Sequence, residues 1–203
     1  YLMNIDDKPS SAIKATVRRY AKTVRVRPVN LKRLPEELAI LRDIHQDAWS
    51  NNWNFVPFTA EEFALIGRDL KLLVPADLVQ IAEVDGQPAA MIVAFPNINE
   101  AIADLDGKLL PFGWAKLLWR LKVSFPRTAR VPLMGIRRQY HNSLLGAALA
   151  LITVNQAREA GTKLGIEQIE LSWILEDNQG MRNILESLGA RVHKRYRFFS
   201  GDL

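Results

Sequence analysis

The sequence contains no cysteine. Disulfide bonds, thiolate metal ligands and a cysteine nucleophile are therefore excluded. The three histidines, His45, His141 and His193, are scattered and lack metal-ligand spacing, so we expect no bound metal. No apolar run reaches the length of a membrane span, and the first residues do not read as a signal peptide. These absences favour a cytoplasmic protein.

What is present is an ordinary globular composition. Of the 203 residues, 48% are hydrophobic and 24% charged, which is enough to bury a sizeable core in one domain. The formal net charge is +5, spread over several segments without a dense basic tail. An anionic cofactor or substrate explains this charge as well as a polynucleotide does, and we do not expect nucleic acid as a partner.

The chain begins at Tyr1 and not at methionine, so one interpretation is a piece of a longer protein. Tyr1–Ile5 is strand-like, and the residues from Ala12 to about Thr23 favour a helix with a basic face. We interpret residues 1–23 as an N-terminal strand and helix, with a linker from a preceding domain as one interpretation. The strand is then the last one of that domain, and an equal alternative is that it reflects only where the given sequence begins.

One long stretch, Arg130–Ala190, is organised as a crossover unit. In order it contains a strand (131–136), a polar basic turn (137–143), an apolar helix (144–160), a second strand (169–174) and a short helix after Asn178. Two parallel strands need a connection of this kind, usually a helix. The stretch therefore predicts a parallel strand pair inside an α/β fold.

The turn of this unit is typical of an anion site. Asn142 or Ser143 is placed to cap the following helix, whose free N–H groups and partial positive charge attract phosphate. Arg137 and Arg138 add mobile positive charge just before it. Gly146 is the only glycine left in the turn region.

This block resembles the acyl-CoA-binding core of the GNAT family of N-acetyltransferases. The family turn, Gln/Arg-x-x-Gly-x-Gly/Ala, here reads His141-Asn142-Ser143-Leu144-Leu145-Gly146. His141 stands for the first family residue, Leu144 replaces the first glycine, and Gly146 matches the last, so the pyrophosphate loop is degenerate. The stretches Trp173–Asn178 and Leu185–Ala190, with Met181 between them, are similar to the family pattern Asn-x-x-Ala…Leu-Tyr-Glu-Lys-Leu-Gly-Phe.

The resemblance covers roughly Val24 to Phe199 and implies an α/β fold of the α+β type. This is the GNAT acyl-CoA N-acyltransferase fold, a mixed central sheet with helices on both faces. It implies a domain at residues 24–203 with an insertion at 97–129. We predict a closing strand at Arg191–Phe199, beside the acceptor.

The implied cosubstrate is acetyl-CoA or another acyl-CoA, with no metal. By family position, the strand backbone at Met134, Gly135 and Ile136 binds the pantetheine arm, with a contribution from Asn178. The implied pyrophosphate site is the turn, with these residues: Arg137, Arg138, His141, Asn142, Ser143, Leu144 and Gly146.

Acyl transfer to an amine needs a neutral amine, a polarised carbonyl and proximity. Glu170 lies in a strand between apolar neighbours, so we expect a raised pKa and nominate it as the base. A surface-facing strand residue is the alternative. Tyr140 and Tyr196 are the available phenols for a general acid, because Leu185 occupies the position of the family tyrosine.

An aromatic-rich loop, Ser50–Phe58, follows a helix that begins near Pro35. By resemblance Trp53, Phe55 and Phe58 line the wall for a small-molecule or peptide amine acceptor; aromatic core packing is the alternative. His45 lies on the apolar stripe of that helix, where we favour a structural role over substrate contact. Thr59 with Glu62 predicts a capping box for the next helix.

The insertion contains an apolar segment with a basic fringe, residues 109–123. It fits a lid, a partner surface or a membrane-interface helix. We favour packing on its own domain or on a sister domain over membrane contact.

The function implied is an acyl-CoA-dependent N-acyltransferase that transfers acetyl directly to an amine. Two alternatives remain open. The first is a non-catalytic CoA-binding or degenerate GNAT module of a tandem-domain protein. The second is a Fem-like aminoacyl transferase, and a homodimer is also compatible with the sequence.

Overall fold

The computed structural model describes residues 1–6, 10–52, 54–197, 199 and 201. Within them the strands form one mixed sheet in the order β1-β6-β5-β4-β3-β2. The strands are β1 (Leu2–Asn4), β2 (Val24–Pro28), β3 (Val79–Val84), β4 (Gln87–Pro96), β5 (Thr128–Ile136) and β6 (Gln168–Leu171). Only the β5–β6 pair is parallel; the other neighbours are antiparallel.

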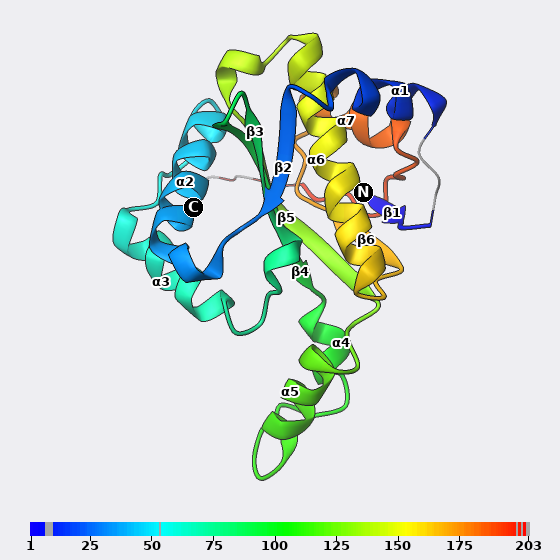
Figure 1. The fold of residues 1–203 in the computed structure, drawn as a ribbon. Coiled ribbons are helices and arrows are strands. Elements are labelled where there is room, and N and C mark those ends of the chain that lie inside the picture. Colours follow the sequence, from blue (N-terminus) through cyan, green and yellow to red (C-terminus); the bar gives the residue numbers. More distant parts are fainter. Residues whose placement is uncertain (7–9, 53, 198, 200, 202–203) are drawn as a thin grey trace.

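Helices cover both faces of this sheet (Figure 1). The helices on the two faces are α1 (Ser11–Tyr20), α2 (Leu34–Trp49), α3 (Ala60–Leu70), α6 (Leu144–Lys163) and α7 (Gln179–Ser187). Apolar side chains of α2 and α3 pack with one face, and those of α1, α6 and α7 with the other. Two further helices, α4 (Ile98–Ile102) and α5 (Gly113–Lys122), project from the end of the sheet. The predicted fold class is confirmed.

Local sequence signals form the contacts that they predict. Thr59 Oγ1 accepts the Glu62 amide at 3.1 Å, and Glu62 Oε2 accepts the Thr59 amide at 2.9 Å, which completes the capping box. Between β3 and β4, Asp85 and Gly86 both have positive φ, as a tight hairpin turn requires. Three single turns of 3₁₀ helix complete the described elements: Leu31–Arg33, Ala76–Leu78 and Arg138–Tyr140.

The first strand belongs to this sheet. β1 pairs antiparallel with β6, and Met3 and Ile5 are buried in the core with α6 and α7. The predicted closing strand at 191–199 is wrong for its described part: Arg191 makes one isolated bridge to Leu2, and residues 192–197 are exposed without a ladder. The physical reason is that β1 already occupies the edge of β6 that such a strand would need.

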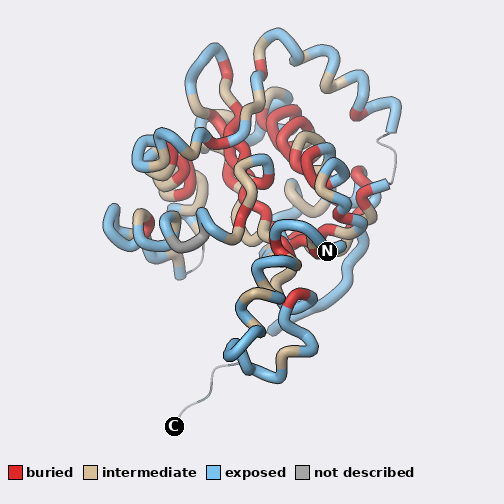
Figure 2. Tube along the Cα trace, turned by 60° about the horizontal axis from the view of Figure 1, so that its bottom comes forward, coloured by how far each residue is buried: buried red, intermediate tan, exposed pale blue. Residues whose placement is uncertain are grey.

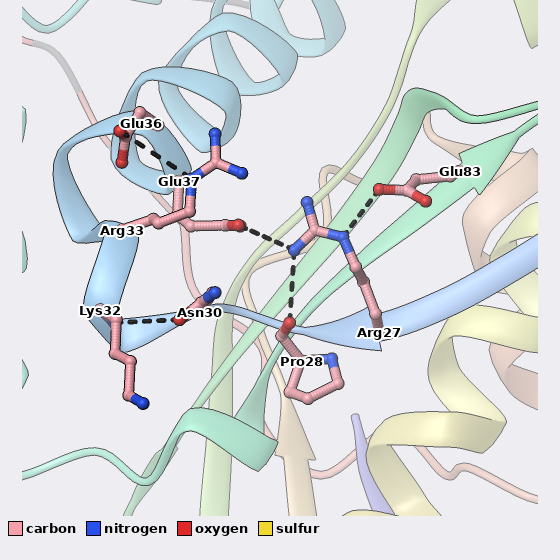
Figure 3. A network of polar contacts seen from close by, with 8 residues as sticks. All are labelled: Arg27, Pro28, Asn30, Lys32, Arg33, Glu36, Glu37 and Glu83. Atoms are coloured by element: carbon pink, nitrogen blue, oxygen red, sulfur yellow. Dashed lines mark hydrogen bonds and ion pairs between the residues drawn. The ribbon is translucent and has the colours of Figure 1, made fainter.

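A buried ionic network fixes the start of α2 on the sheet (Figure 3). Arg27 of β2 donates to Glu37 of α2 at 2.9 Å and to Glu83 of β3 at 2.7 Å. Burial disfavours the charge of Arg27, but the two carboxylates outweigh this cost and raise its pKa. With its start held in this way, α2 runs across the sheet and its last turn reaches β5.

Candidate active site

The parallel strands β5 and β6 separate beyond Val131 and Leu171, and the V-shaped opening between them is the fork. The two strands pair from Thr128 with Gln168 as far as Val131 with Leu171. The Ser172 amide then donates to the Val131 carbonyl at 3.3 Å, and the paired stretch ends. Because β5 continues to Ile136, its second half is paired with β4 alone.

A bulge in β5 decides which backbone groups face the fork. Val131 and Pro132 together lie opposite the single residue Ala94 of β4. Proline is tolerated at such a bulge because no ladder donor is needed there. Beyond the bulge, the Arg137 amide donates to the Ala89 carbonyl of β4 at 2.9 Å. By strand alternation, the backbone groups of Met134 and Ile136 therefore point into the fork.

Two side chains contact these fork-facing carbonyls. Trp49 Nε1, from the last turn of α2, donates to the Met134 carbonyl at 3.1 Å. His141 Nε2 lies 2.8 Å from the Ile136 carbonyl, so that nitrogen carries the proton. Between them Gly135 faces α2, where an added Cβ would come within 3.1 Å of Ala48 Cβ.

An aromatic cluster lies behind Trp49. The His45 ring centroid is 4.9 Å from that of Trp49, 5.4 Å from that of Phe55 and 5.6 Å from that of Phe58. His45 is 2% exposed, and its Nδ1 has no partner in the described part of the chain. Burial lowers its pKa, which favours a neutral imidazole. The third predicted wall residue, Trp53, lies outside the described residues.

The turn after β5 leads into the N-terminus of α6. Ser143 Oγ accepts the Gly146 amide at 3.0 Å and donates to the Tyr140 carbonyl at 2.6 Å. A Cβ on Gly146 would lie 2.0 Å from that carbonyl oxygen, so glycine is required there. The amides of Leu144 and Leu145 make no hydrogen bond to the described part of the chain. They are the groups at this helix end that can receive an anion.

The remaining turn residues have structural contacts. Arg137 pairs with Asp43 and donates to the Pro88 carbonyl at 2.7 Å. Arg138 donates its amide to Asp47 at 2.7 Å and its Nε at 3.2 Å. Carboxylates of α2 therefore pair with both arginines, which stay predicted cofactor-binding residues. Asn142 adopts a left-handed φ of 54° just before the cap.

The predicted proton-transfer residues do not converge. Glu170 lies on the paired part of β6, half-buried, opposite Arg130 of β5. The Tyr140 ring packs against the apolar cluster between α6 and the sheet. Tyr196 is exposed, with its ring centroid 6.4 Å from that of Trp173.

Two further positions in the second half of the block have clear roles. Asn178 Oδ1 accepts the Met181 amide at 3.1 Å and caps α7. Leu185, at the family tyrosine position, is buried in the core. Across the described residues, no three His, Asp or Glu side chains converge in a way that would hold a metal ion. No helix of that part of the chain is long and apolar enough to cross a membrane.

Sequence reasoning did not assign Trp49 to the fork, and it favoured a structural role for His45 over substrate contact. The available signal was their spacing of four residues on one helical stripe, followed by the aromatic loop. That spacing shows that the two side chains share a helix face. It does not show that this face reaches the unpaired edge of a strand more than 80 residues away.

Comparison with known proteins found no matching family model. The chain is 53% identical over 194 residues to Protein YghO of Escherichia coli K12, covering 96% of this chain and 50% of that protein. It is 42% identical over 197 residues to the bacterial ceramide synthase of Caulobacter vibrioides, covering 97% and 51% respectively. The chain thus spans about half the length of the curated relatives that it matches.

Solved structures identify the architecture. A GCN5-related N-acetyltransferase from Sphaerobacter thermophilus superimposes with a TM-score of 0.55 at 13% identity, over 93% of this chain and 45% of that one. An aminoglycoside N-acetyltransferase solved with CoA gives 0.53 at 15% identity, over 89% and 95%. The chain has the GNAT fold. At these identities the likeness concerns the fold alone.

Proposed function

We propose that this chain is an acyl-CoA-dependent N-acyltransferase domain. The observation that carries the proposal is the continuity of the fork with an anion site. The unpaired edge of β5 leads directly into the turn whose helix presents the Leu144 and Leu145 amides. A pantetheine arm carries amide groups and ends in a pyrophosphate, so it needs a strand edge followed by an anion site.

The residues of the fork fit this cosubstrate if the side chains of Trp49 and His141 can move away from the strand edge. Backbone groups of Met134 and Ile136 offer the strand edge, and Ser143 with Gly146 shapes the turn. Both fork-facing carbonyls already accept hydrogen bonds from Trp49 and His141. Pantetheine binding at this edge therefore requires these two side chains to turn away.

The proposed reaction transfers an acyl group from sulfur to nitrogen. The amine nitrogen attacks the thioester carbonyl carbon, the C–N bond forms, the C–S bond breaks, and CoA leaves with the proton lost by nitrogen. The imidazole of His45, whose Nδ1 has no partner in the described part of the chain, joins Glu170 as a candidate acceptor of the proton that the nitrogen loses after attack. Tyr196, near Trp173, remains the candidate phenol; Tyr140 is dropped, because its ring is packed beneath α6.

The acceptor class is inferred from the relative named a bacterial ceramide synthase. A ceramide is an amide between a fatty acid and a long-chain amino alcohol, and its synthesis is N-acylation. We therefore propose a long-chain primary amine as acceptor and a long-chain acyl-CoA as donor, with acetyl-CoA as the shorter alternative. Phe55 and Phe58 offer this acceptor an apolar wall.

A degenerate GNAT module of a longer protein is the second candidate. It is favoured by the occupied carbonyls of Met134 and Ile136 and by the exposed Leu144 side chain in place of a glycine. In this alternative the fork is closed by Trp49 and His141, and the fold serves as a scaffold.

Leu144 offers a test that separates the two candidates. Leu144→Pro removes one of the two unpaired amides of the first helical turn, and proline is tolerated at the first helical position. The preceding residue, Ser143, already has the extended backbone (φ −122°, ψ 157°) that a following proline requires. Leu144→Ala is the matched control, because it shortens the side chain and keeps the amide.

Binding of CoA, acetyl-CoA and palmitoyl-CoA is measured by calorimetry. We expect Leu144→Pro to weaken all three by about tenfold, the value of one hydrogen bond to a charged group. Leu144→Ala should bind as well as wild type. Formation of N-palmitoyl sphinganine from palmitoyl-CoA and sphinganine then tests transfer. Absence of binding in all three proteins excludes the enzyme proposal, and binding without product supports the degenerate module.

A further inference from the structure

The segment between β4 and β5, residues 97–127, forms an arm that extends away from the sheet (Figure 1). Asp104 pairs with Lys116 and Arg120 of α5, and Arg120 also donates to the Ala101 carbonyl of α4 at 2.8 Å. These contacts hold α4 and α5 together as one unit. The arm is therefore a helical hairpin held by its own contacts and not an irregular loop.

The arm exposes many large apolar side chains to solvent. Leu110 is 79% exposed and Phe112 is 77% exposed. Further exposed apolar side chains of the arm are Leu109, Trp114, Leu118, Trp119 and Val123. In Figure 2 the arm is mainly pale blue and tan, whereas the strands and α6 are largely red. Many exposed apolar side chains within one short segment indicate a candidate interaction site.

The arm carries both signs of charge, but its three acidic residues, Glu100, Asp104 and Asp106, all precede Lys108. From Lys108 to Arg127 the sequence has five basic residues and no acidic residue. Lys108 and Lys122 are exposed and make no ion pair with the described part of the chain. Each lies beside exposed apolar side chains. Long lysine side chains can keep their charge in water while their stems lie along apolar surface.

Aromatic and aliphatic side chains fringed by unpaired lysines are complementary to an anionic lipid surface. α5 has ten residues and cannot cross a bilayer, which fits a helix that lies within the interface. The Trp114 indole N–H already donates to the Pro111 carbonyl at 2.9 Å, so its polar group is satisfied when the ring leaves water. A groove on another protein would be expected to present acidic partners to these same lysines.

We propose that the arm inserts its exposed apolar side chains into the headgroup region of an anionic lipid membrane. The proposal rests on exposure and charge and is independent of the acyl-transfer proposal. The arm precedes the first residue of β5, Thr128, whereas the anion turn follows the last, Ile136. The two sites are therefore at opposite ends of the same strand, and membrane docking leaves the turn uncovered.

The test is co-sedimentation with vesicles of phosphatidylcholine containing phosphatidylglycerol, and with vesicles of phosphatidylcholine alone. Leu110→Ser with Phe112→Ser removes two apolar side chains from the arm. Val56→Ser with Leu72→Ser is the matched control, because these side chains are 74% and 70% exposed on the body. We expect the arm pair to weaken binding to the anionic vesicles by about tenfold or more, since interfacial affinity scales with inserted apolar area. The control pair should bind as wild type does.

A second set of variants tests the contribution of the lysine charges. Lys108→Glu with Lys122→Glu should reduce binding to anionic vesicles and its sensitivity to salt, whereas Lys14→Glu with Lys22→Glu, on the body, should change both much less. Thermal unfolding of each variant shows that the fold is kept. The proposal is overturned if the wild-type protein binds neither kind of vesicle. It is also overturned if the body variants lose as much vesicle binding as the arm variants do. It is also overturned if sedimentation velocity shows a dimer that only the arm variants dissociate, because the occupant is then a second copy of the chain.

Discussion

Helices α6 and α5 show how differently the body and the arm use apolar residues. In α6 the side chains of Leu149, Ile152 and Val154 are buried against the sheet. In α5 the side chains of Trp114 and Trp119 are exposed, although both helices are rich in apolar residues. The difference lies in what each helix can pack on: α6 has a six-stranded sheet, and α5 has the five residues of α4. An apolar helix therefore stabilises the fold only where the topology supplies a partner.

The largest expected effect sharpens this comparison directly. Leu149→Ala, in the body, should lower the free energy of unfolding by about 3–5 kcal/mol, through lost apolar burial and the cavity that it leaves. Trp119→Ala, in the arm, removes a larger side chain. It should change the free energy of unfolding by about 0.5 kcal/mol or less, because the ring is mostly exposed to water already. Urea unfolding of both variants measures this. Equal losses would mean that the arm is packed in solution and would refute the contrast.

Ion pairs provide the second comparison. Arg27→Met leaves Glu37 buried without its cation and should cost about 2–3 kcal/mol, less than for a fully enclosed pair because Arg27 is partly exposed. Asp104→Asn, which breaks the ion pairs of the arm, is the control. Lys116 and Arg120 hold the Asp104 pKa well below its usual range, but at this exposed site the gain is screened by solvent. A loss for Asp104→Asn as large as that for Arg27→Met would contradict the contrast.

The smallest expected effect concerns pH. Burial lowers the His45 pKa below its unfolded value of 6.5, so below that pH the unfolded chain binds more protons at this residue than the folded chain. Stability from the neutral imidazole is therefore complete above about pH 6.5 and decreases on acidification, by at most about 1.4 kcal/mol per pH unit. His45→Phe should flatten this dependence between pH 7.5 and 5.5, and His193→Gln, at an exposed site, should leave it unchanged. Identical slopes in wild type and His45→Phe would show that His45 does not carry the effect.

Much of the fold follows from local signals. The Thr59 capping box, a cap at Asn142 or Ser143 and the order strand–turn–helix–strand were predicted, and the structure contains each of them, with Ser143 as the cap. Each is decided within a few residues, by a side chain that meets its own backbone or by a dihedral that glycine permits. Such signals survive in the sequence because no distant part of the chain is needed to complete them.

The candidate site was predictable only in part. The Ser143–Gly146 turn was found because its chemistry is local, whereas the partners of Arg137 and Arg138 lie on α2, more than 90 residues earlier. Trp49 at the fork belongs to the same class, because its contact depends on where α2 crosses β5. The misplaced strand at 191–199 has the same origin: nothing local shows that β1 occupies the edge of β6.

By itself the sequence determined the helices and their caps, the tight turns, the α/β order and the helix N-terminus suited to an anion. The tertiary structure alone decided which strand edge stays unpaired, which carboxylates neutralise the turn arginines, and which apolar helix remains in water. The physical reason is range. Caps, turns and periodicity arise from interactions along a few residues, whereas strand pairing, ion pairing and burial depend on segments that meet only when the whole sheet has formed.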